Sequence, residues 1–467
     1  MTSAWVIAVG RPTFDLDFGA AHVDDAWSVL AALDIEVAGD RNIVVDDLDE
    51  AIDSIGPSDV VVVLQATFTD SSLTGRIVER TRRPVLVWSF PEERTGARLR
   101  LNSLCGANLA AYLLRRRRDR AQFVHIDPTA ATAVQVVGDA LRCLVAPASS
   151  DATTRHGGAA VATRRGGHRD HVLSGLRIGV IGDPPIGFEP CVGDVDELLR
   201  STGIEVDRIP LHDLFAAADG VGDPVRAAIS QRIHSTMTVD DDVGRAGIEE
   251  SIRLFGGLSE LAASHGWSAL ATRCWPECMT EYGGAACTPM AMLTEDGVPS
   301  VCEADMYGAA TALILRHVAG SDPFVADLVD ADPRDDTSVV WHCGVAPISI
   351  ADPRSVPVGI THPNRHRALA NQFALRPGTV TLARLSQASG QISMVIGSGR
   401  ILDRPRPFIG TCGVLQWDRS VDEVLRSVFD RGLEHHIGLV YGEHREALEE
   451  LAAAWDLPVV ILGSATV

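Results

Sequence analysis

Short runs of consecutive apolar residues recur through the first two thirds of this chain. Residues 60–67 and 85–90 form two such runs, and residues 71–81 between them have the pattern of a helix. Strands buried on both faces of a parallel sheet show this continuous pattern, whereas half-exposed strands alternate apolar and polar residues. The sequence therefore predicts an α/β fold with doubly wound parallel sheets, and further strands are expected at 175–182, 268–274, 298–302 and 339–343.

Two changes of composition divide the chain into three predicted domains. Residues 146–171 are rich in Ala, Thr, Gly and Arg without an apolar period, so a linker or long loop is expected there. After about residue 355 the sequence pattern changes, and the pattern of residues 379–396 predicts a β-hairpin. We expect two doubly wound α/β domains followed by a smaller β-rich C-terminal domain, at residues 1–170, 171–355 and 356–467.

The charge balance excludes several classes of partner. The chain has 41 Lys and Arg against 62 Asp and Glu, a formal net charge of −21. Such a charge disfavours binding to nucleic acid and to anionic membranes. No apolar stretch reaches the roughly 18 residues of a membrane-spanning helix, and residues 1–7 have no signal-peptide pattern. We expect a cytoplasmic protein with neither nucleic-acid nor membrane partners.

Two common kinds of cofactor site have no sequence signature here. Residues 179–182 follow a predicted strand, but they do not form a Gly-x-Gly-x-x-Gly motif, and no phosphate-binding Walker A pattern occurs. The nine cysteines are scattered and contain no pair of Cys-x-x-Cys motifs, which argues against structural zinc. We expect neither a nucleotide cofactor nor a zinc site.

Glu303 and Asp327 are the candidate catalytic and metal-binding acids. Glu303 follows the predicted strand 298–302, and Asp327 comes just after an apolar, helix-like stretch. This order can bring two carboxylates together in a cleft, where they repel unless a cation or a shared proton intervenes. Oxygen ligands of this kind suit Mg²⁺ or Mn²⁺. From local spacing alone, the two residues could equally be a helix cap and a surface acid.

Histidines at two predicted strand ends could complete a metal site. His342 lies at the mouth of the strand 339–343, where a lone His could also be purely structural. His435 and His436 open the late strand, and side chains alternate along a strand. We therefore expect only one of this pair to face a site shared with the carboxylates.

A further strand end offers groups that can bind a polyol. Arg273, Trp275 and Glu277 follow the predicted strand 268–274 and provide a guanidinium, an indole and a carboxylate. Two carboxylates with one or two imidazoles make a plausible Mn²⁺ set, which would hold adjacent sugar oxygens and polarise the carbonyl. A carboxylate could then move a proton between carbons one and two. This arrangement serves aldose–ketose isomerisation through an enediol.

Residues 302–327 resemble the metal-binding region of the L-fucose isomerases. In that family a Glu within a Glu-x-Asp segment and an Asp closing a Phe-x-Asp segment bind Mn²⁺ and serve as the acid–base pair, which implies these roles for Glu303 and Asp327. Residues 432–441 are similar to the Gly-x-x-His-His strand of L-arabinose isomerases, which implies that His436 is a ligand. His342 matches a further arabinose isomerase ligand that fucose isomerases lack.

The resemblance also implies an assembly. Segments 102–108 and 182–188 look like those of bacterial proteins grouped with fucose isomerases. In this family the first domain of one subunit closes the active site of its neighbour within trimers or hexamers. A homo-trimer or hexamer is expected, in which Trp88 and Asn102 contact the substrate; ordinary strand-to-helix turns remain the alternative for their loops.

Three functions remain open from the sequence. The leading hypothesis is an Mn²⁺-dependent ketol isomerase acting on a free sugar. A second retains the metal but changes the reaction to epimerisation or carbon–carbon cleavage of a modified sugar or sugar acid. A third is a non-catalytic sugar-binding protein, against which the predicted metal triad argues, since a receptor needs only hydrogen-bonding groups.

Overall fold

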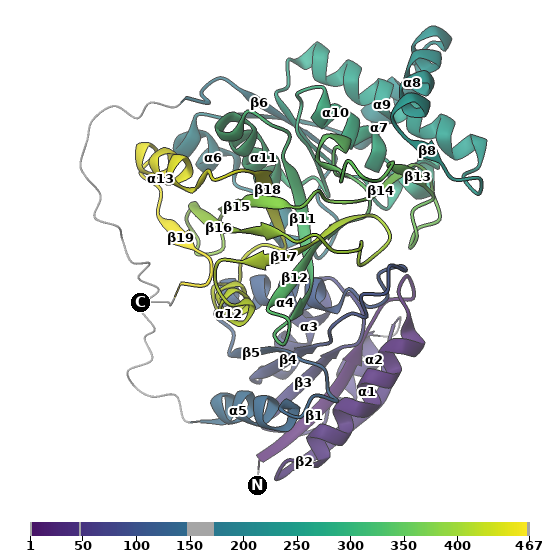
Figure 1. Ribbon diagram of the computed structural model, residues 1–467. Coiled ribbons are helices and arrows are strands. Elements are labelled where there is room, and N and C mark those ends of the chain that lie inside the picture. Colours follow the sequence, from purple (N-terminus) through teal and green to yellow (C-terminus); the bar gives the residue numbers. More distant parts are fainter. Residues whose placement is uncertain (1, 46–47, 147–171, 465–467) are drawn as a thin grey trace.

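The computed structural model describes residues 2–45, 48–146 and 172–464 (Figure 1). The predicted linker at 146–171 lies outside these ranges except for Ala146. The first unit is a five-stranded parallel sheet in the order β2-β1-β3-β4-β5, as predicted for a doubly wound domain. Its elements are β1 Thr2–Val9, α1 Leu16–Ala31, β2 Ile35–Val44, α2 Leu48–Asp53, β3 Val60–Gln65, α3 Ser71–Thr81, β4 Val85–Ser89, α4 Ser103–Arg117, β5 Ala121–His125 and α5 Ala133–Val145.

The second unit is a smaller parallel sheet in the order β10-β9-β6-β7. Three of its strands, β6, β9 and β10, coincide with apolar runs of the sequence, whereas the partly exposed β7 does not, and helices pack around the sheet (Figure 1). In open sheets of this kind, ligands bind beyond the carboxyl ends of the strands. The elements are β6 Arg177–Ile181, α6 Val195–Thr202, β7 Glu205–Ile209, α7 Leu211–Asp219, α8 Asp223–Thr236, α9 Arg245–His265, β9 Ala269–Thr272, α10 Cys287–Glu295, β10 Ser300–Cys302 and α11 Met306–Ala319.

The third unit contains a closed barrel within a ten-stranded sheet. The sheet order is β19-β16-β15-β18-β11-β12-β17-β14-β13-β8, and an added β16–β17 pairing closes the strands from β16 to β17 into a ring. All pairings around this ring are antiparallel. The elements are β8 Thr238–Val239, β11 Phe324–Asp332, β12 Thr337–His342, β13 Val358–Ile360, β14 Ala370–Ala374, β15 Gly378–Ser386, β16 Ser393–Ile401, β17 Thr411–Trp417, α12 Val421–Arg431, β18 His436–Tyr441, α13 Arg445–Ala454 and β19 Val459–Ile461.

The fold class is confirmed, with one correction to the predicted domain composition. The predicted hairpin is the antiparallel pair β15–β16. However, β11 and β12, which the sequence assigned to the second α/β domain, pair with each other and with strands of the barrel. Their residues are buried almost throughout. A continuous apolar run reports burial on both faces, and a covered barrel strand meets that condition as well as a parallel strand does.

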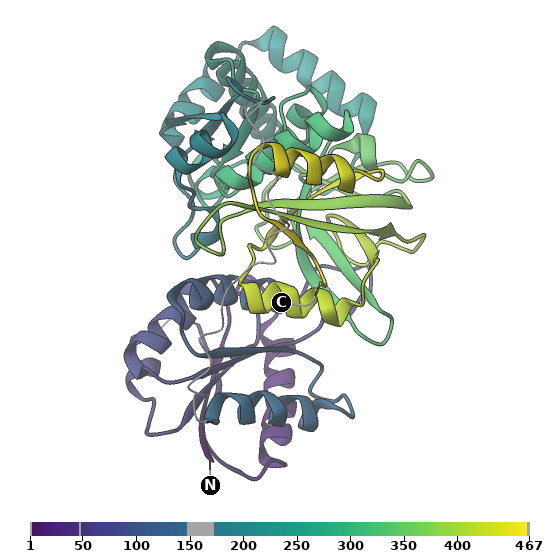
Figure 2. The same cartoon turned by 90° about the vertical axis from the view of Figure 1, so that its left-hand side faces the viewer.

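The barrel lies between the two parallel-sheet units. Figure 2 shows α12 between the barrel and the first unit, and α12 packs against α4 there. The rings of Phe123 and Phe429 stack with centroids 5.3 Å apart, and Arg115 Nε donates to the Phe429 carbonyl at 3.0 Å. On the opposite side α11 packs against β15 and β18. Within the described residues, no helix combines the length and apolar character needed to cross a membrane.

Candidate active site

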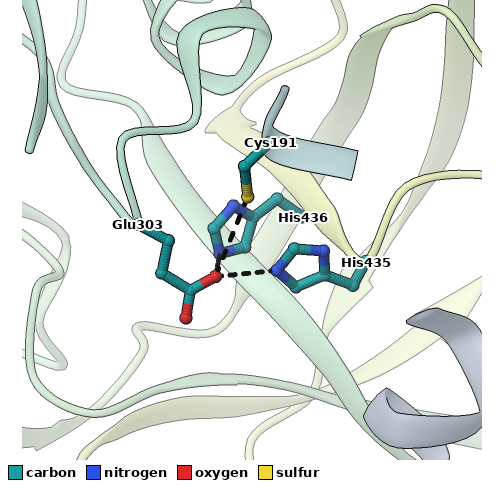
Figure 3. A group of neighbouring side chains, drawn as sticks. All are labelled: Cys191, Glu303, His435 and His436. Atoms are coloured by element: carbon teal, nitrogen blue, oxygen red, sulfur yellow. Dashed lines mark hydrogen bonds and ion pairs between the residues drawn. The ribbon is translucent and has the colours of Figure 1, made fainter. Parts of the chain in front are cut away.

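Glu303 is held at the carboxyl end of β10 by an unusual backbone turn. Glu303 and Ala304 have φ angles of 64° and 52°, in the left-handed region that residues with a side chain rarely adopt. Such conformations cost on the order of 1–3 kcal/mol each and gather at functional sites. The turn leads into α11, whose N-cap is Asp305, and it leaves the Glu303 side chain among Cys191, His435 and His436 (Figure 3).

Strand pairing brings Asp327 and His436 to the same place. The two residues stand opposite each other in the antiparallel pair β11–β18. His436 Nε2 lies 3.6 Å from Glu303 Oε2 and 3.7 Å from Asp327 Oδ1. These separations are too long for hydrogen bonds, and neither His436 Nε2 nor Asp327 Oδ1 has a hydrogen-bond partner. Ligand atoms that share one cation at roughly 2.1 Å lie at such separations.

His435 also faces this cluster, contrary to the expectation from strand alternation. Its Nε2 lies 2.9 Å from Glu303 Oε2, and the His435 and His436 rings are only 4.1 Å apart between centroids. Alternation holds within a strand, and β18 begins at His436, so His435 belongs to the preceding bend. Both histidines therefore contribute to one site.

Asp305 and Arg384 support His436 from behind. Asp305 Oδ2 lies 2.8 Å from His436 Nδ1, and the Arg384 guanidinium holds both Asp305 oxygens at 2.6 and 2.9 Å. His436 Nδ1–H can thus donate to Asp305, which leaves the Nε2 lone pair free to bind a cation. Neither residue was predicted as part of the site from the sequence, in which the Glu-x-Asp spacing was the one signal for Asp305.

The electrostatics of the cluster favour the ionic states that bind a cation. Burial opposes ionisation of Glu303, but the hydrogen bond from His435 and the electrostatic effect of the neighbouring histidines outweigh it, so the pKa of Glu303 falls to about 2. Burial lowers the pKa of His436, and the adjacent His435 lowers it further. Burial acts the same way on His435, but the bond to Glu303 outweighs it and raises its pKa. An ionised carboxylate and a neutral imidazole are the forms that ligate metals.

Cys191 completes the tightest group of possible metal-binding atoms. The ligand atoms of Cys191, Glu303, His435 and His436 all lie within 4.8 Å of one another. Cys191 Sγ is 4.0 Å from Glu303 Oε2 (Figure 3). Burial and then the negative charge of Asp305 raise the pKa of this thiol well above its ordinary value. A protonated thiol is a poor ligand.

His342, the other predicted ligand, lies beside the cluster. Its ring centroid is 5.6 Å from that of His436, and only 3% of the residue is exposed. The backbone N–H of Cys343 donates to His342 Nδ1 at 2.9 Å, which leaves Nε2 as the nitrogen available to a ligand. Its role in binding a metal stays a prediction.

Of the three predicted polyol-binding residues, Trp275 contacts the cluster. Its Nε1–H donates to Glu303 Oε1 at 3.2 Å. Arg273 and Glu277 form an ion pair with each other and line a cavity of about 630 Å³ together with Asp183. This pairing occupies the groups that were expected to meet the sugar, and their role in substrate binding stays a prediction.

Trp88 and Asn102 lie in the first domain. Trp88 is fully buried in its core and donates from Nε1 to the Ile126 carbonyl at 3.0 Å. Asn102 begins α4 with a φ of 49° and is 6% exposed. Because the Trp88 side chain is covered, it could act on a neighbouring site only by supporting the loop that follows it. A role for either residue in substrate binding stays a prediction.

The chain's own first domain also approaches the cluster. Phe68 and Cys105 share a small apolar core with Phe188 and Cys191. Phe188 in turn packs edge-on against Trp275, with centroids 5.3 Å apart, and lies 5.8 Å from the His435 ring. The candidate site is therefore enclosed by all three units of the fold.

The fold and this cluster define an α/β protein with a buried set of carboxylates and imidazoles suited to a divalent cation. Comparison with known proteins narrows the class. The model of the L-fucose isomerase C-terminal domain family matches residues 354–462. A sulfoquinovose isomerase of Priestia aryabhattai is 30% identical over 468 residues, covering 98% of both chains. Another, from Alkalicoccus urumqiensis, is 31% identical and covers 89% of both chains.

The chain belongs to the L-fucose isomerase-like family, as its motifs implied. It is an isomerase of carbohydrate metabolism, in the class of intramolecular oxidoreductases, which removes the non-catalytic alternative.

Proposed function

We propose that this protein is a metal-dependent aldose–ketose isomerase that works through an enediol. The observation that carries the proposal is the convergence of Glu303 Oε2, Asp327 Oδ1 and His436 Nε2, with the imidazole nitrogen 3.6 and 3.7 Å from the two oxygens. The unpartnered state of His436 Nε2 and Asp327 Oδ1 supports a cation between them, because buried polar atoms normally have partners.

Glu303, Asp327 and His436 would hold the cation, with His342 as a candidate fourth ligand. Two carboxylates and an imidazole suit Mn²⁺ better than the soft metals that prefer sulfur. When bound, the cation supplies Lewis-acid polarisation of the sugar carbonyl. Hydrogen bonding of His436 Nδ1 to Asp305 would fix the ring orientation that this role requires.

The proton chemistry belongs to the carboxylates. In our proposal Glu303 and Asp327 form the acid–base pair: one takes the proton from carbon two of the aldose while the oxygen on carbon one gains a proton, which gives the enediol. The hydroxyl on carbon two then loses its proton as a proton is returned to carbon one, which gives the ketose. Its low pKa keeps Glu303 ionised near neutral pH, which is the form of a carboxylate that can act as a base. The cluster is enclosed, since Glu303 is 9% and Asp327 7% exposed, which strengthens the electrostatic interactions within the site.

The named relatives suggest the substrate. They are sulfoquinovose isomerases, and sulfoquinovose is an aldose with a sulfonate on carbon six. We extend this substrate to the present chain, which would convert it to the corresponding ketose. Epimerisation or carbon–carbon cleavage of a modified sugar remains the second candidate, because either reaction can begin with the same proton abstraction.

The experiment is a turnover assay in deuterated water, read by NMR, with sulfoquinovose and Mn²⁺. Ketose formed with deuterium at carbon one is the expected result. Deuterium at carbon two without ketose would point to epimerisation, and a cleaved product would point to carbon–carbon chemistry. If the metal-loaded protein isomerised another aldose but not sulfoquinovose, the proposed substrate would be wrong and the proposed reaction would stand.

The assembly is part of the same proposal. By analogy with the family, we propose a homo-trimer or hexamer in which loops 88–92 and 102–108 lie near a neighbour's site. Light scattering should give a trimer or a multiple of one, and Asn102→Ala should lower activity while leaving metal content unchanged. A fully active monomer would contradict this arrangement.

A further inference from the structure

Arg365 carries a charge that no carboxylate of the described structure neutralises. It lies in the loop between β13 and β14, where it is partly buried. Its guanidinium carbon stands 4.3 Å from the centroid of the Trp275 ring, and it forms no ion pair with any Asp or Glu in the described residues. Its partner within the chain is therefore an aromatic face.

The other guanidinium groups near the site are paired. Arg384 is bound to Asp305 and Arg273 to Glu277. Arg11 also approaches Trp275, with 5.9 Å to the ring centroid, but it is paired with Asp70. An enclosed charge without a partner is costly. Burial lowers the pKa of Arg365 and the charge of Arg11 adds to this effect, while Cys343 and the Glu303 carboxylate offset it only in part, as expected for a guanidinium that forms no ion pair.

Trp275 links this free charge to the candidate catalytic acid. The indole Nε1–H donates to Glu303 Oε1 at 3.2 Å, while the Arg365 guanidinium stands over the ring of the same side chain. One indole thus separates the two groups. A sugar held by its first two carbons at Glu303 would extend past the indole for its opposite end to meet Arg365.

We propose that Arg365 is the specificity-determining residue that binds a tetrahedral anion at the far end of the sugar, the sulfonate on carbon six. This inference rests on the proposed function and adds the group that selects the substrate. A guanidinium presents a planar fork that can donate to two oxygens of such an anion. A sulfonate keeps its negative charge throughout the physiological pH range, so the pair forms without a proton transfer.

The kinetic test compares charged and neutral substrates in wild type and Arg365→Gln. Loss of a partner from an enclosed charge pair should lower kcat/KM for sulfoquinovose about 30- to 1,000-fold, chiefly through KM. Turnover of glucose, which has no charge at carbon six, should change less than about threefold. The kcat/KM of Arg365→Lys for sulfoquinovose should lie between those of wild type and Arg365→Gln, because Lys keeps the charge but not the planar fork of donors. Arg367→Gln, an exposed Arg of the same loop, is the matched control.

Equal losses for sulfoquinovose and glucose would overturn the proposal, since they would mean general damage to the site. Better turnover of glucose 6-phosphate than of sulfoquinovose by the wild type would also overturn it, by making phosphate the anion.

A binding measurement separates this inference from the proposed function. The Glu303→Gln variant should have little turnover, so calorimetry in saturating Mn²⁺, which offsets its weaker metal binding, can follow sulfoquinovose binding to it with and without the added Arg365→Gln change. Weaker binding in the double variant supports the anion site even if the wild type fails to isomerise sulfoquinovose. Equal affinities in both variants would overturn the role of Arg365 whatever the reaction.

Discussion

Two clusters of charged side chains each include an Asp of β11, and they differ in how well their polar atoms are partnered. The interdomain cluster, between the first domain and β11, consists of Glu92, Arg94, His125 and Asp330. Arg94 Nε donates to Asp330 Oδ2 at 2.6 Å, and Glu92 accepts the backbone N–H groups of residues 100–102. Among these four side chains, His125 Nε2 alone lacks a partner.

The site cluster of Glu303, Asp327, His435 and His436 is the opposite case. Asp327 Oδ1, His435 Nδ1 and His436 Nε2 all lack partners, although each is buried. The interdomain cluster borders a cavity of about 1170 Å³, which is larger than the cavity of about 630 Å³ beside Arg273 and Glu277. The comparison teaches that neither cavity size nor the presence of His, Asp and Glu identifies the site. The site is identified by buried polar atoms that lack partners and converge on one point.

We expect the largest loss of activity and metal from changes to the acids of the site cluster, and not from a change to an acid of the interdomain cluster. Glu303→Gln and Asp327→Asn each remove a charged oxygen, and we expect activity to fall about 10²- to 10⁴-fold with a sharp loss of bound Mn²⁺. Metal content by elemental analysis and turnover by NMR are the measurements. Glu92→Gln is the matched control: it should keep the metal and lose about 1–3 kcal/mol of stability, since three backbone donors face it. Full metal content and turnover in either site variant would refute the assignment.

The two adjacent histidines should differ next. His436 Nε2 lies between both carboxylates, whereas His435 contacts Glu303. We expect His436→Asn to lower metal affinity more than His435→Asn, which should chiefly impair proton transfer. Mn²⁺ titrations of both variants, with activity at saturating metal, measure the difference. If excess Mn²⁺ restored neither variant, or both equally, the two residues would not have these separate roles.

The interdomain cluster should appear in the pH dependence of stability. Burial lowers the pKa of His125 to about 4 from its ordinary 6.5. Because the pKa of His125 is lower in the folded state than in the unfolded state, where it is about 6.5, protons bind the unfolded state preferentially as the pH falls. The free energy of unfolding is therefore unaffected above about pH 6.5 and decreases as the pH falls toward 4. At about 1.4 kcal/mol per pKa unit, the loss is about 3 kcal/mol.

Urea unfolding of wild type and His125→Gln between pH 7 and pH 4 tests this. The variant should lose about 3 kcal/mol less over this range, while the exposed His212→Gln should follow the wild type. Parallel curves for wild type and His125→Gln would show that His125 is not neutral and buried in the folded protein.

Much of the fold could be predicted because burial leaves a pattern in the sequence. The runs at 60–67 and 85–90 and the helix at 71–81 correspond to β3, β4 and α3. The same pattern misassigned β12, since an apolar run records that a strand is covered and not which strand pairs with it. No strand was predicted at β11, because acidic residues interrupt its apolar pattern. Partner choice depends on contacts distant in sequence, such as Asp327 with His436 in β11–β18.

Those residues of the candidate site that belong to a family motif or stand at a predicted strand end could be predicted from the sequence. Glu303, Asp327 and His436 were all singled out from the sequence, and the structure brings them together. His435 was assigned to the wrong face because the rule of alternation was applied beyond the start of β18. Arg384 and Arg365 had no local signal, because their significance depends on whether a carboxylate from another element lies beside them.

The smallest effect should come from Cys191, and it sharpens the definition of the site cluster. Cys191 lies as close to the imidazoles as a ligand would, yet its thiol is held protonated by burial and by the negative charges around it. Mn²⁺ also prefers oxygen and imidazole ligands to sulfur. We expect Cys191→Ala to keep its full Mn²⁺ content and to change kcat/KM less than about threefold, in contrast to every change at Glu303. Loss of metal from this variant would make the thiolate a ligand, and the geometry would then favour a softer ion such as Zn²⁺ in place of Mn²⁺.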